Sequence, residues 1–216
     1  MEWAVLGIFI FFLIVTYIVV QGTRAALAWR KAAAAGDVNV IRDIVEDSLD
    51  AWRSAKRPKE VPVEVWRGIQ SMQIVEIEAE MVRVSCQAEG DYRLVNGRWV
   101  ETASPLQEGM AVTTRALDML LYELPNFKPA KVQIDVYTTF RDADGATRRA
   151  CILSTSATRE AAREVDWEEW TPLEVVDALS GRYLLGDSGQ PLPVEVEEPK
   201  VMESESAEAP PAPART

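Results

Sequence analysis

The 216-residue sequence contains no histidine and only two cysteines. Without histidine the chain has no Ser-His or Cys-His nucleophile, no histidine ligand for zinc and no imidazole that exchanges protons near neutral pH. Positive charge is also scarce, because 23 Lys and Arg residues are outnumbered by 34 Asp and Glu residues, for a formal net charge of -11. Since affinity for nucleic acid depends on Lys and Arg that neutralise phosphates, we expect no nucleic-acid partner.

Glycine-rich phosphate-binding loops are missing as well. The chain contains no GxxxxGK[ST], no GxGxxG and no GxSxG sequence. The sequence therefore offers no motif for a catalytic, cofactor-binding or metal-binding site, and we predict no cofactor. An enzyme is not excluded, because many active sites are assembled from residues scattered along the chain.

One long apolar run is present near the start of the chain. Residues 3–20 read WAVLGIFIFFLIVTYIVV, where 16 of 18 side chains are apolar and none is charged. A helix of that length measures about 27 Å, close to the roughly 30 Å of a bilayer's hydrocarbon core. We predict an uncleaved transmembrane anchor over residues 1–22, followed by a water-soluble remainder.

The charges beside this run predict its orientation. A cleaved signal peptide would carry positive charge before a shorter apolar run. Here only two residues precede the run, and the positive residues Arg24, Arg30 and Lys31 follow it. Since positive residues concentrate on the cytoplasmic side, we expect a single-pass protein of the cell membrane whose C-terminal domain faces the cytoplasm. A secreted domain with the opposite topology is the alternative.

Residues 23–56 are expected to form a helical stem and then an amphipathic helix. The first half is Ala-rich and basic and should continue the anchor, and Asp37 is a typical N-cap for the second helix. The second helix carries an apolar stripe that includes Ile41, Val45 and Trp52. This stripe packs on the following domain, on a partner protein or on a second copy, so the three residues are candidates for protein interaction.

Residues 57–186 are predicted to form an α+β domain with a mostly antiparallel sheet built from two β-hairpins. Asn96-Gly97 lies between two β-prone runs and predicts a hairpin over residues 91–101. A second hairpin is expected over residues 131–156, with its loop at 142–145. The helices that pack on this sheet are expected at residues 62–71, 104–124, 158–165 and 171–181. Ser104 with Gln107 and Thr171 with Glu174 are expected to form the capping boxes that begin two of them.

The apolar alternation of residues 72–86 changes phase at Met81–Val82. A slip of one residue turns all later side chains to the other face, so this segment is either one strand with a β-bulge or two strands in tandem.

Carboxylates are the remaining candidates for chemistry. Glu76, Glu78 and Glu80 alternate along one strand face, where they either hold a hard cation or line a solvent-exposed surface. A flat row of carboxylates does not converge on an ion, which favours the solvent-exposed surface. Asp135 lies on a hairpin strand, like the metal-binding acids of some nucleases, but the next strand lacks the Glu-x-Lys that accompanies them.

Two tryptophans and two cysteines leave alternatives open. Trp167 and Trp170 lie in the acidic sequence DWEEW, where they either cover the core or form a recognition patch. Cys86 and Cys151 fall in β-like runs, where they are buried thiols, a disulfide or reactive thiols.

The rest of the chain, residues 187–216, is rich in Pro, Ala and Glu and is predicted to be a disordered acidic tail.

Together these features predict a single-pass membrane protein whose cytoplasmic α+β domain is a non-enzymatic module for protein interaction, tethering or assembly in a membrane complex. Its partner is expected to be another protein or a second copy of the chain. The alternative function is a membrane-tethered enzyme, or a small-ligand or metal sensor, that uses the carboxylates named above.

Overall fold

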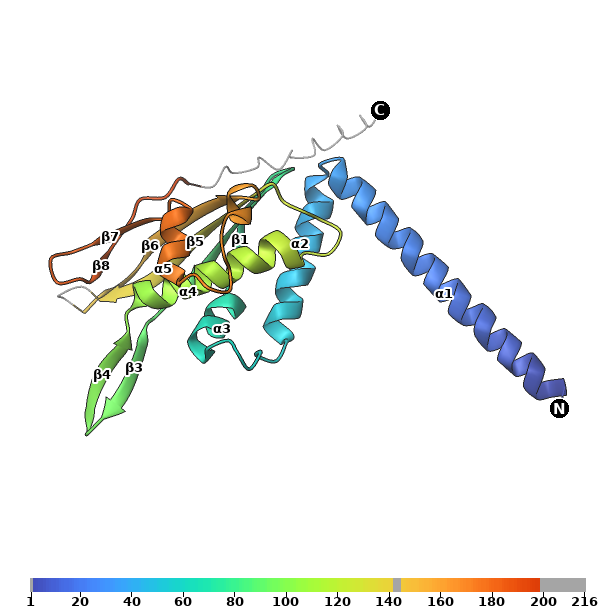
Figure 1. Cartoon of the computed structure of the whole chain (residues 1–216), viewed down its shortest axis with the longest axis horizontal. Coiled ribbons are helices and arrows are strands. Elements are labelled where there is room, and N and C mark those ends of the chain that lie inside the picture. Colours follow the sequence, from blue (N-terminus) through green and yellow to red (C-terminus); the bar gives the residue numbers. More distant parts are fainter. Residues whose placement is uncertain (1, 142–144, 199–216) are drawn as a thin grey trace, which may run out of the picture.

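The computed structural model describes residues 2–141 and 145–198 (Figure 1). Within these residues the chain has an α+β fold, as the sequence predicts, with five α-helices and a mixed six-stranded sheet. The helices are α1 (Glu2–Ala34), α2 (Val38–Ser54), α3 (Val63–Gln70), α4 (Pro105–Asp118) and α5 (Pro172–Ala178). The strands are β1 (Gln73–Ile77), β2 (Met81–Gln87), β3 (Asp91–Val95), β4 (Arg98–Ala103), β5 (Lys131–Arg141), β6 (Thr147–Thr158), β7 (Arg182–Leu185) and β8 (Pro191–Leu192).

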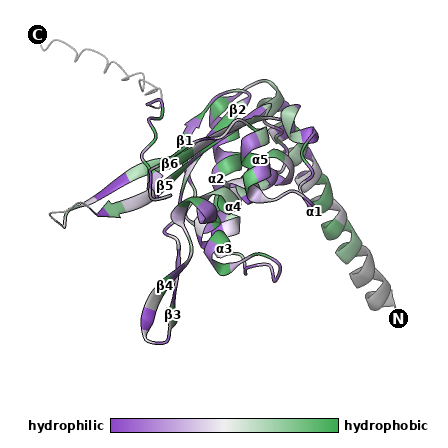
Figure 2. Cartoon of the chain, turned by 60° about the vertical axis from the view of Figure 1, so that its left-hand side comes forward, coloured by the Kyte–Doolittle hydropathy of each residue, from purple (hydrophilic) through white to green (hydrophobic). Residues whose placement is uncertain are grey.

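The apolar N-terminal run and the basic stem form one continuous helix, α1. Residues 10–20 of this helix are exposed to solvent, and its hydrophobic turns stand clear of the domain (Figures 1 and 2). From Ile10 to Ala34 the helix is long and apolar enough to cross a membrane. A turn with Gly36 at φ +78° ends it, and the side chain of Asp37 accepts the backbone N–H groups of Asn39 and Val40 to begin α2.

The main sheet has the strand order β1-β2-β5-β6-β7-β8. β2 and β5 are parallel, whereas every other neighbouring pair is antiparallel. A parallel pair needs a crossover connection, and here the chain passes from β2 to β5 through β3, β4 and α4. Among the described residues, the helices of the domain lie on one face of this sheet (Figures 1 and 2).

Every second side chain of the central strands β2 and β5 points toward the helices, and these side chains form the core between sheet and helices. Val82, Val84, Ile134 and Val136 are fully buried, and a Cβ placed on Gly109 of α4 would lie 3.1 Å from Val136, so α4 packs closely on this face. α2 also packs against the domain through its apolar stripe. This burial of branched apolar side chains is the main source of stability for the domain.

The structure resolves the change of phase in residues 72–86. β1 and β2 are two antiparallel strands, and the chain reverses between Ile77 and Met81, where the backbone N–H of Glu78 donates to the carbonyl of Met81. The register also shifts between Ile74 and Glu76. Of the two alternatives, two successive strands are therefore confirmed, whereas a bulge at Met81–Val82 is not observed; the register shift lies within β1 instead.

β3 and β4 pair through a turn in which Asn96 has φ +51° and Gly97 has φ +77°. They form a separate two-stranded sheet that projects from the domain (Figures 1 and 2). We call residues 91–103 the arm. The expectation that both predicted hairpins build one sheet is wrong, because the arm lies within the crossover and does not pair with the main strands.

Two of the predicted helices differ from those observed. The helix starting at Ser104 has the expected capping box with Gln107, but after Asp118 it continues as a π-helical turn, Met119–Glu123. The helix predicted for residues 158–165 is wrong, because β6 extends to Thr158 and only a single 3₁₀ turn, Ala161–Arg163, follows it.

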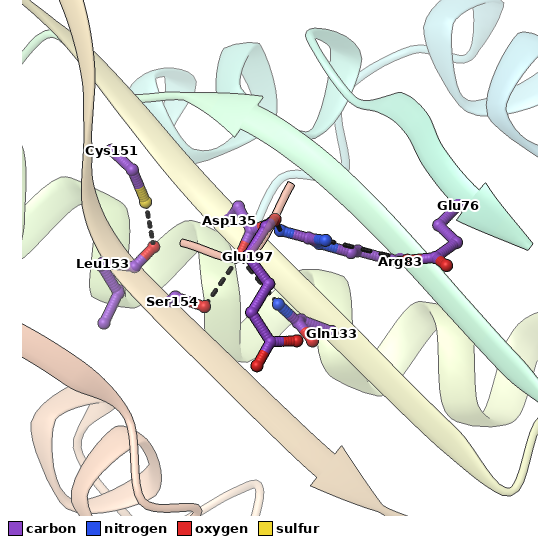
Figure 3. Close-up of polar contacts among 8 residues, drawn as sticks. All are labelled: Glu76, Arg83, Gln133, Asp135, Cys151, Leu153, Ser154 and Glu197. Carbon is purple, nitrogen blue, oxygen red and sulfur yellow. Dashed lines mark hydrogen bonds and ion pairs between the residues drawn. The ribbon is translucent and has the colours of Figure 1, made fainter. Parts of the chain in front are cut away.

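The chain also remains ordered beyond the predicted start of the tail. After β7, residues 191–192 form β8. Residues 193–198, which we call the strap, lie against the face of the sheet opposite the helices, where Glu197 is beside Arg83 and Asp135 (Figure 3). The prediction of disorder from residue 187 therefore does not hold for residues 187–198, and its remaining part, 199–216, lies outside the described residues.

Candidate functional site

The face of the main sheet opposite the helices carries a row of polar side chains, and we call it the open face. It arises because the residues that alternate with the buried valines of β2, β5 and β6 point to the other side. The strand register places Arg83 beside Gln133, Ser85 beside Asp135 and Asp135 beside Ser154. Polar residues from three strands therefore meet at the middle of the open face.

Asp135 is the centre of this polar group, although it is completely buried. Its Oδ2 accepts the Nε–H of Arg83 at 2.7 Å, and its Oδ1 accepts the hydroxyl of Ser154 at 2.7 Å and the amide of Gln133 at 3.2 Å (Figure 3). Both carboxylate oxygens thus have partners within the chain, which compensates for the loss of water around a buried charge.

Arg83 links this group to an edge strand and to the strap. Only 3% of the residue is exposed, and its Nη1 lies 3.7 Å from Oε2 of Glu76 on β1. Its Nη2 donates to the backbone carbonyl of Glu197 at 2.7 Å. The guanidinium therefore holds together β1, β2, β5 and the strap, and each of its three nitrogens has a partner (Figure 3).

This geometry does not favour carboxylate chemistry. Asp135 is enclosed and fully hydrogen-bonded, and Glu76 is turned toward Arg83. Glu78 and Glu80 lie in the turn between β1 and β2, so the predicted row of three glutamates is split between a strand and a turn. Across residues 2–141 and 145–198, no group of three Asp, Glu or Cys side chains is arranged to hold a metal ion.

The two cysteines are free and buried. Burial, with the nearby charge of Asp135, raises the pKa of Cys151 to about 11, and the same causes raise the pKa of Cys86 further. Both side chains are therefore neutral thiols at physiological pH, and a neutral thiol is a poor nucleophile. They behave as small core residues, not as a reactive pair.

Three interaction candidates lie on α2. Ile41 and Val45 are fully buried in the core, and Trp52 is half-buried against it. The apolar stripe of α2 thus packs on the chain's own domain, so that Ile41 and Val45 have no surface to offer a partner in this conformation.

The two candidates in DWEEW differ from each other. The ring of Trp167 is half-buried and meets Tyr122 edge-on at 6.2 Å, and its indole N–H donates to the carbonyl of Ala162 at 3.1 Å. Trp170 is 38% exposed. Trp167 therefore serves mainly to cover the core, whereas Trp170 still offers surface to a partner.

Sequence reasoning missed Arg83 and Arg149, which belong to the open face. Arg149 is exposed on β6, and its guanidinium lies 4.7 Å from the ring centre of Tyr137 on β5. Each arginine has a weak signal in the sequence. In MVRVSC, Arg83 alternates with valines, so its side chain points away from the face that the valines bury. In TRRAC, Arg149 is two residues before Cys151 and therefore lies on the same strand face as the cysteine. Strand pairing, which brings them together, is not visible in either segment.

Replacement of Asp135 by Ala should leave the buried guanidinium of Arg83 without its main counter-charge. We expect the free energy of unfolding to fall by about 3–5 kcal/mol, measured by urea denaturation of the full chain in mild detergent. The double variant Arg83→Met with Asp135→Leu removes both charges and should recover most of that loss. A double variant as unstable as the single one would show that the ion pair is not the source of the effect.

The buried thiols should make the domain less stable at alkaline pH. The pKa of Cys151 is raised from 9.0, so that in the unfolded chain it loses its proton near pH 9 while the folded chain keeps it. Stability is therefore complete below pH 9 and falls as pH rises toward 11, by about 1 kcal/mol from Cys151 alone between pH 9 and 10. Urea unfolding at pH 8, 9 and 10 measures this slope, which the Cys151→Ala variant should reduce. An unchanged slope in that variant would contradict the assignment.

No protein-family model matches the chain, and no curated protein and no solved structure matches it at a significant level. The function proposed below accordingly rests on the residues and the geometry of this chain.

Proposed function

We propose that this chain is a single-pass protein of the cell membrane whose cytoplasmic α+β domain acts as a non-enzymatic module for protein interaction, tethering or assembly. The anchor is supported by the exposed apolar length of α1, because residues 10–20 are exposed and pack on none of the other described residues. Orientation is supported by Arg24, Arg30 and Lys31, which follow the apolar run and favour the cytoplasmic side.

The arm is the observation that carries the proposed protein interaction. It exposes apolar side chains on a projecting hairpin, where Tyr92 is 50%, Leu94 60% and Val100 44% exposed. An isolated two-stranded hairpin is only marginally stable in water, and each strand of the arm has one unpaired edge. Exposed apolar surface of this kind is typical of protein interaction sites. A partner that covers the arm would bury these side chains and complete the pairing of its strands.

No observation favours the alternative enzyme or sensor to a similar degree. Its candidate carboxylate Asp135 is occupied by Arg83, Gln133 and Ser154, which leaves no oxygen directed at solvent.

The membrane part of the proposal predicts protease protection. The full chain should stay in the membrane pellet after alkaline extraction, and protease added to intact cells should leave the domain undigested until the cells are lysed. Digestion in intact cells would instead indicate the opposite topology. Release by alkaline extraction would contradict the anchor itself.

The interaction part predicts that a change in the arm reduces partner capture. Leu94→Asp places a charge on the exposed apolar side of the arm and should reduce crosslinking of the full chain to its partner in native membranes several-fold, measured by quantitative mass spectrometry. Leu173→Asp is the matched control, because Leu173 is an exposed leucine on α5, outside the arm. Equal crosslinking by both variants would reject the arm as the contact site. A wild-type chain that is a monodisperse monomer without crosslinks would contradict the interaction part of the proposal.

A further inference from the structure

The strap lies on the open face as an extended segment. Val194 and Val196 are half-buried, whereas Glu195, Glu197 and Glu198 are exposed. The alternation is that of a strand, with apolar side chains turned inward and acids turned outward. The open face therefore already holds one extended segment of this chain, through its backbone and its inward-facing valines.

Two hydrogen bonds join the strap to the sheet, and the strap contributes a backbone group to each of them. The N–H of Val194 donates to the carbonyl of Cys151 at 2.8 Å, and the carbonyl of Glu197 accepts from Nη2 of Arg83 at 2.7 Å. Every residue except proline provides both a backbone N–H and a carbonyl, whatever its side chain. Another extended segment can therefore make the same two bonds, and specificity must come from side chains elsewhere on the face.

Arg149 on β6 lines two adjoining cavities of about 410 and 300 Å³. The smaller cavity lies on the open face, between Val75, Ser85 and Tyr137. The larger one continues past the margin of the sheet to the helices, where Arg53 of α2 and Gln70 of α3 line it. We call the two cavities together the arginine recess. Glutamine, serine and tyrosine side chains supply its other polar groups, and none of the described residues that line it is acidic (Gln70, Gln73, Gln87, Ser71, Ser85 and Tyr137).

Arg149 is the arginine of the recess that is available to a ligand. Arg53 pairs with Asp50 and also donates to the carbonyl of Met72. Arg149 stacks on Tyr137 instead, and among the described residues no carboxylate lies within 4 Å of it. The nearby Glu89 bonds to Thr139, the residue opposite Arg149 on β5. An arginine without a counter-charge, held in place by an aromatic ring, is suited to bind a carboxylate.

We propose that the open face is the docking surface for an extended acidic peptide segment of the partner protein, and that the strap occupies part of this surface in the free chain. The partner segment replaces the strap on Cys151 and Arg83 through its backbone, and it places a carboxylate on Arg149. This inference rests on the proposed interaction function and assigns a surface and a partner chemistry to it.

A labelled copy of the strap tests whether another peptide can replace the strap on the open face. The probe is a fluorescein-labelled peptide of residues 192–198, LPVEVEE, added to the full chain in mild detergent. The Val194→Pro variant lacks the N–H that donates to Cys151, and it lies after the last strand, so that the fold is kept while the strap is loosened. Fluorescence anisotropy should show at least about tenfold tighter binding of the peptide to this variant than to the wild type. Equal binding to the two proteins overturns the role of the strap.

Charge reversal at two neighbouring positions tests the recess. The probe here is a second labelled peptide, EPVEVEE, in which Leu192 is replaced by Glu, because residue 192 precedes Val194 by two positions as Arg149 precedes Cys151. In the Val194→Pro chain, Arg149→Glu should weaken binding of this peptide at least about tenfold. Arg148→Glu makes the same change in net charge at the next residue, which is also exposed but lies on the opposite face of β6, and it should leave binding nearly unchanged. Equal weakening by both variants means unspecific charge attraction and overturns the proposed site.

Crosslinking in native membranes separates this inference from the proposed function. Loss of the partner from the full-length Arg149→Glu chain, with retention by Arg148→Glu, is the expected result. A partner retained by both variants overturns the open face as its docking surface but leaves the interaction function standing. The absence of any partner on the wild-type chain overturns the interaction function, and with it the assignment of a partner to this surface.

Discussion

The ion pair between Arg83 and Asp135 is the interaction on which the centre of the sheet depends. Two charges placed in a protein interior lose the solvation of water, and their mutual attraction compensates only when further hydrogen bonds satisfy the remaining atoms. Here Ser154 and Gln133 donate hydrogen bonds to the carboxylate of Asp135. The guanidinium of Arg83 also pairs with Glu76 and donates to the strap carbonyl of Glu197. The pair thus fixes the relative positions of β1, β2, β5 and β6, and it gives the last described segment of the chain a place on the sheet.

Much of the fold could be predicted from local sequence signals. Asp37, Ser104 and Thr171 cap the helices that they were expected to cap, and Asn96-Gly97 forms the turn between β3 and β4. These signals are reliable because each depends on the backbone of a few neighbouring residues. The helix expected at residues 158–165 was wrong because the pairing of Thr158 with Lys131 extends β6, and such pairing depends on a distant part of the chain.

The candidate site was harder to predict, for the same physical reason. Asp135 was considered from the sequence as a metal ligand, but its partner Arg83 is 52 residues away and meets it only through the parallel pairing of β2 and β5. The strap was also missed, because residues 193–198 resemble a disordered acidic segment in composition and are held by backbone bonds that leave no mark in the sequence. Ile41 and Val45 are candidates for protein interaction in the sequence, but they are buried in the chain's own core. The sequence does not distinguish the two cases, because the apolar stripe of an amphipathic helix has the same pattern whether its own domain or a partner covers it.

The uninterrupted course of α1 has a geometric consequence for the domain. From Gln21 to Ala34 the helix continues for about 20 Å beyond the apolar run without a break. If the run spans a bilayer as proposed, this part acts as a stiff spacer that sets the height of the Gly36 turn above the hydrocarbon core. From that turn α2 runs back in the direction of the N-terminal end of α1 (Figure 1). In that arrangement the domain would lie in the layer beside the spacer, close to the membrane surface, and the number of helical turns, not a flexible tether, would set its distance from the bilayer.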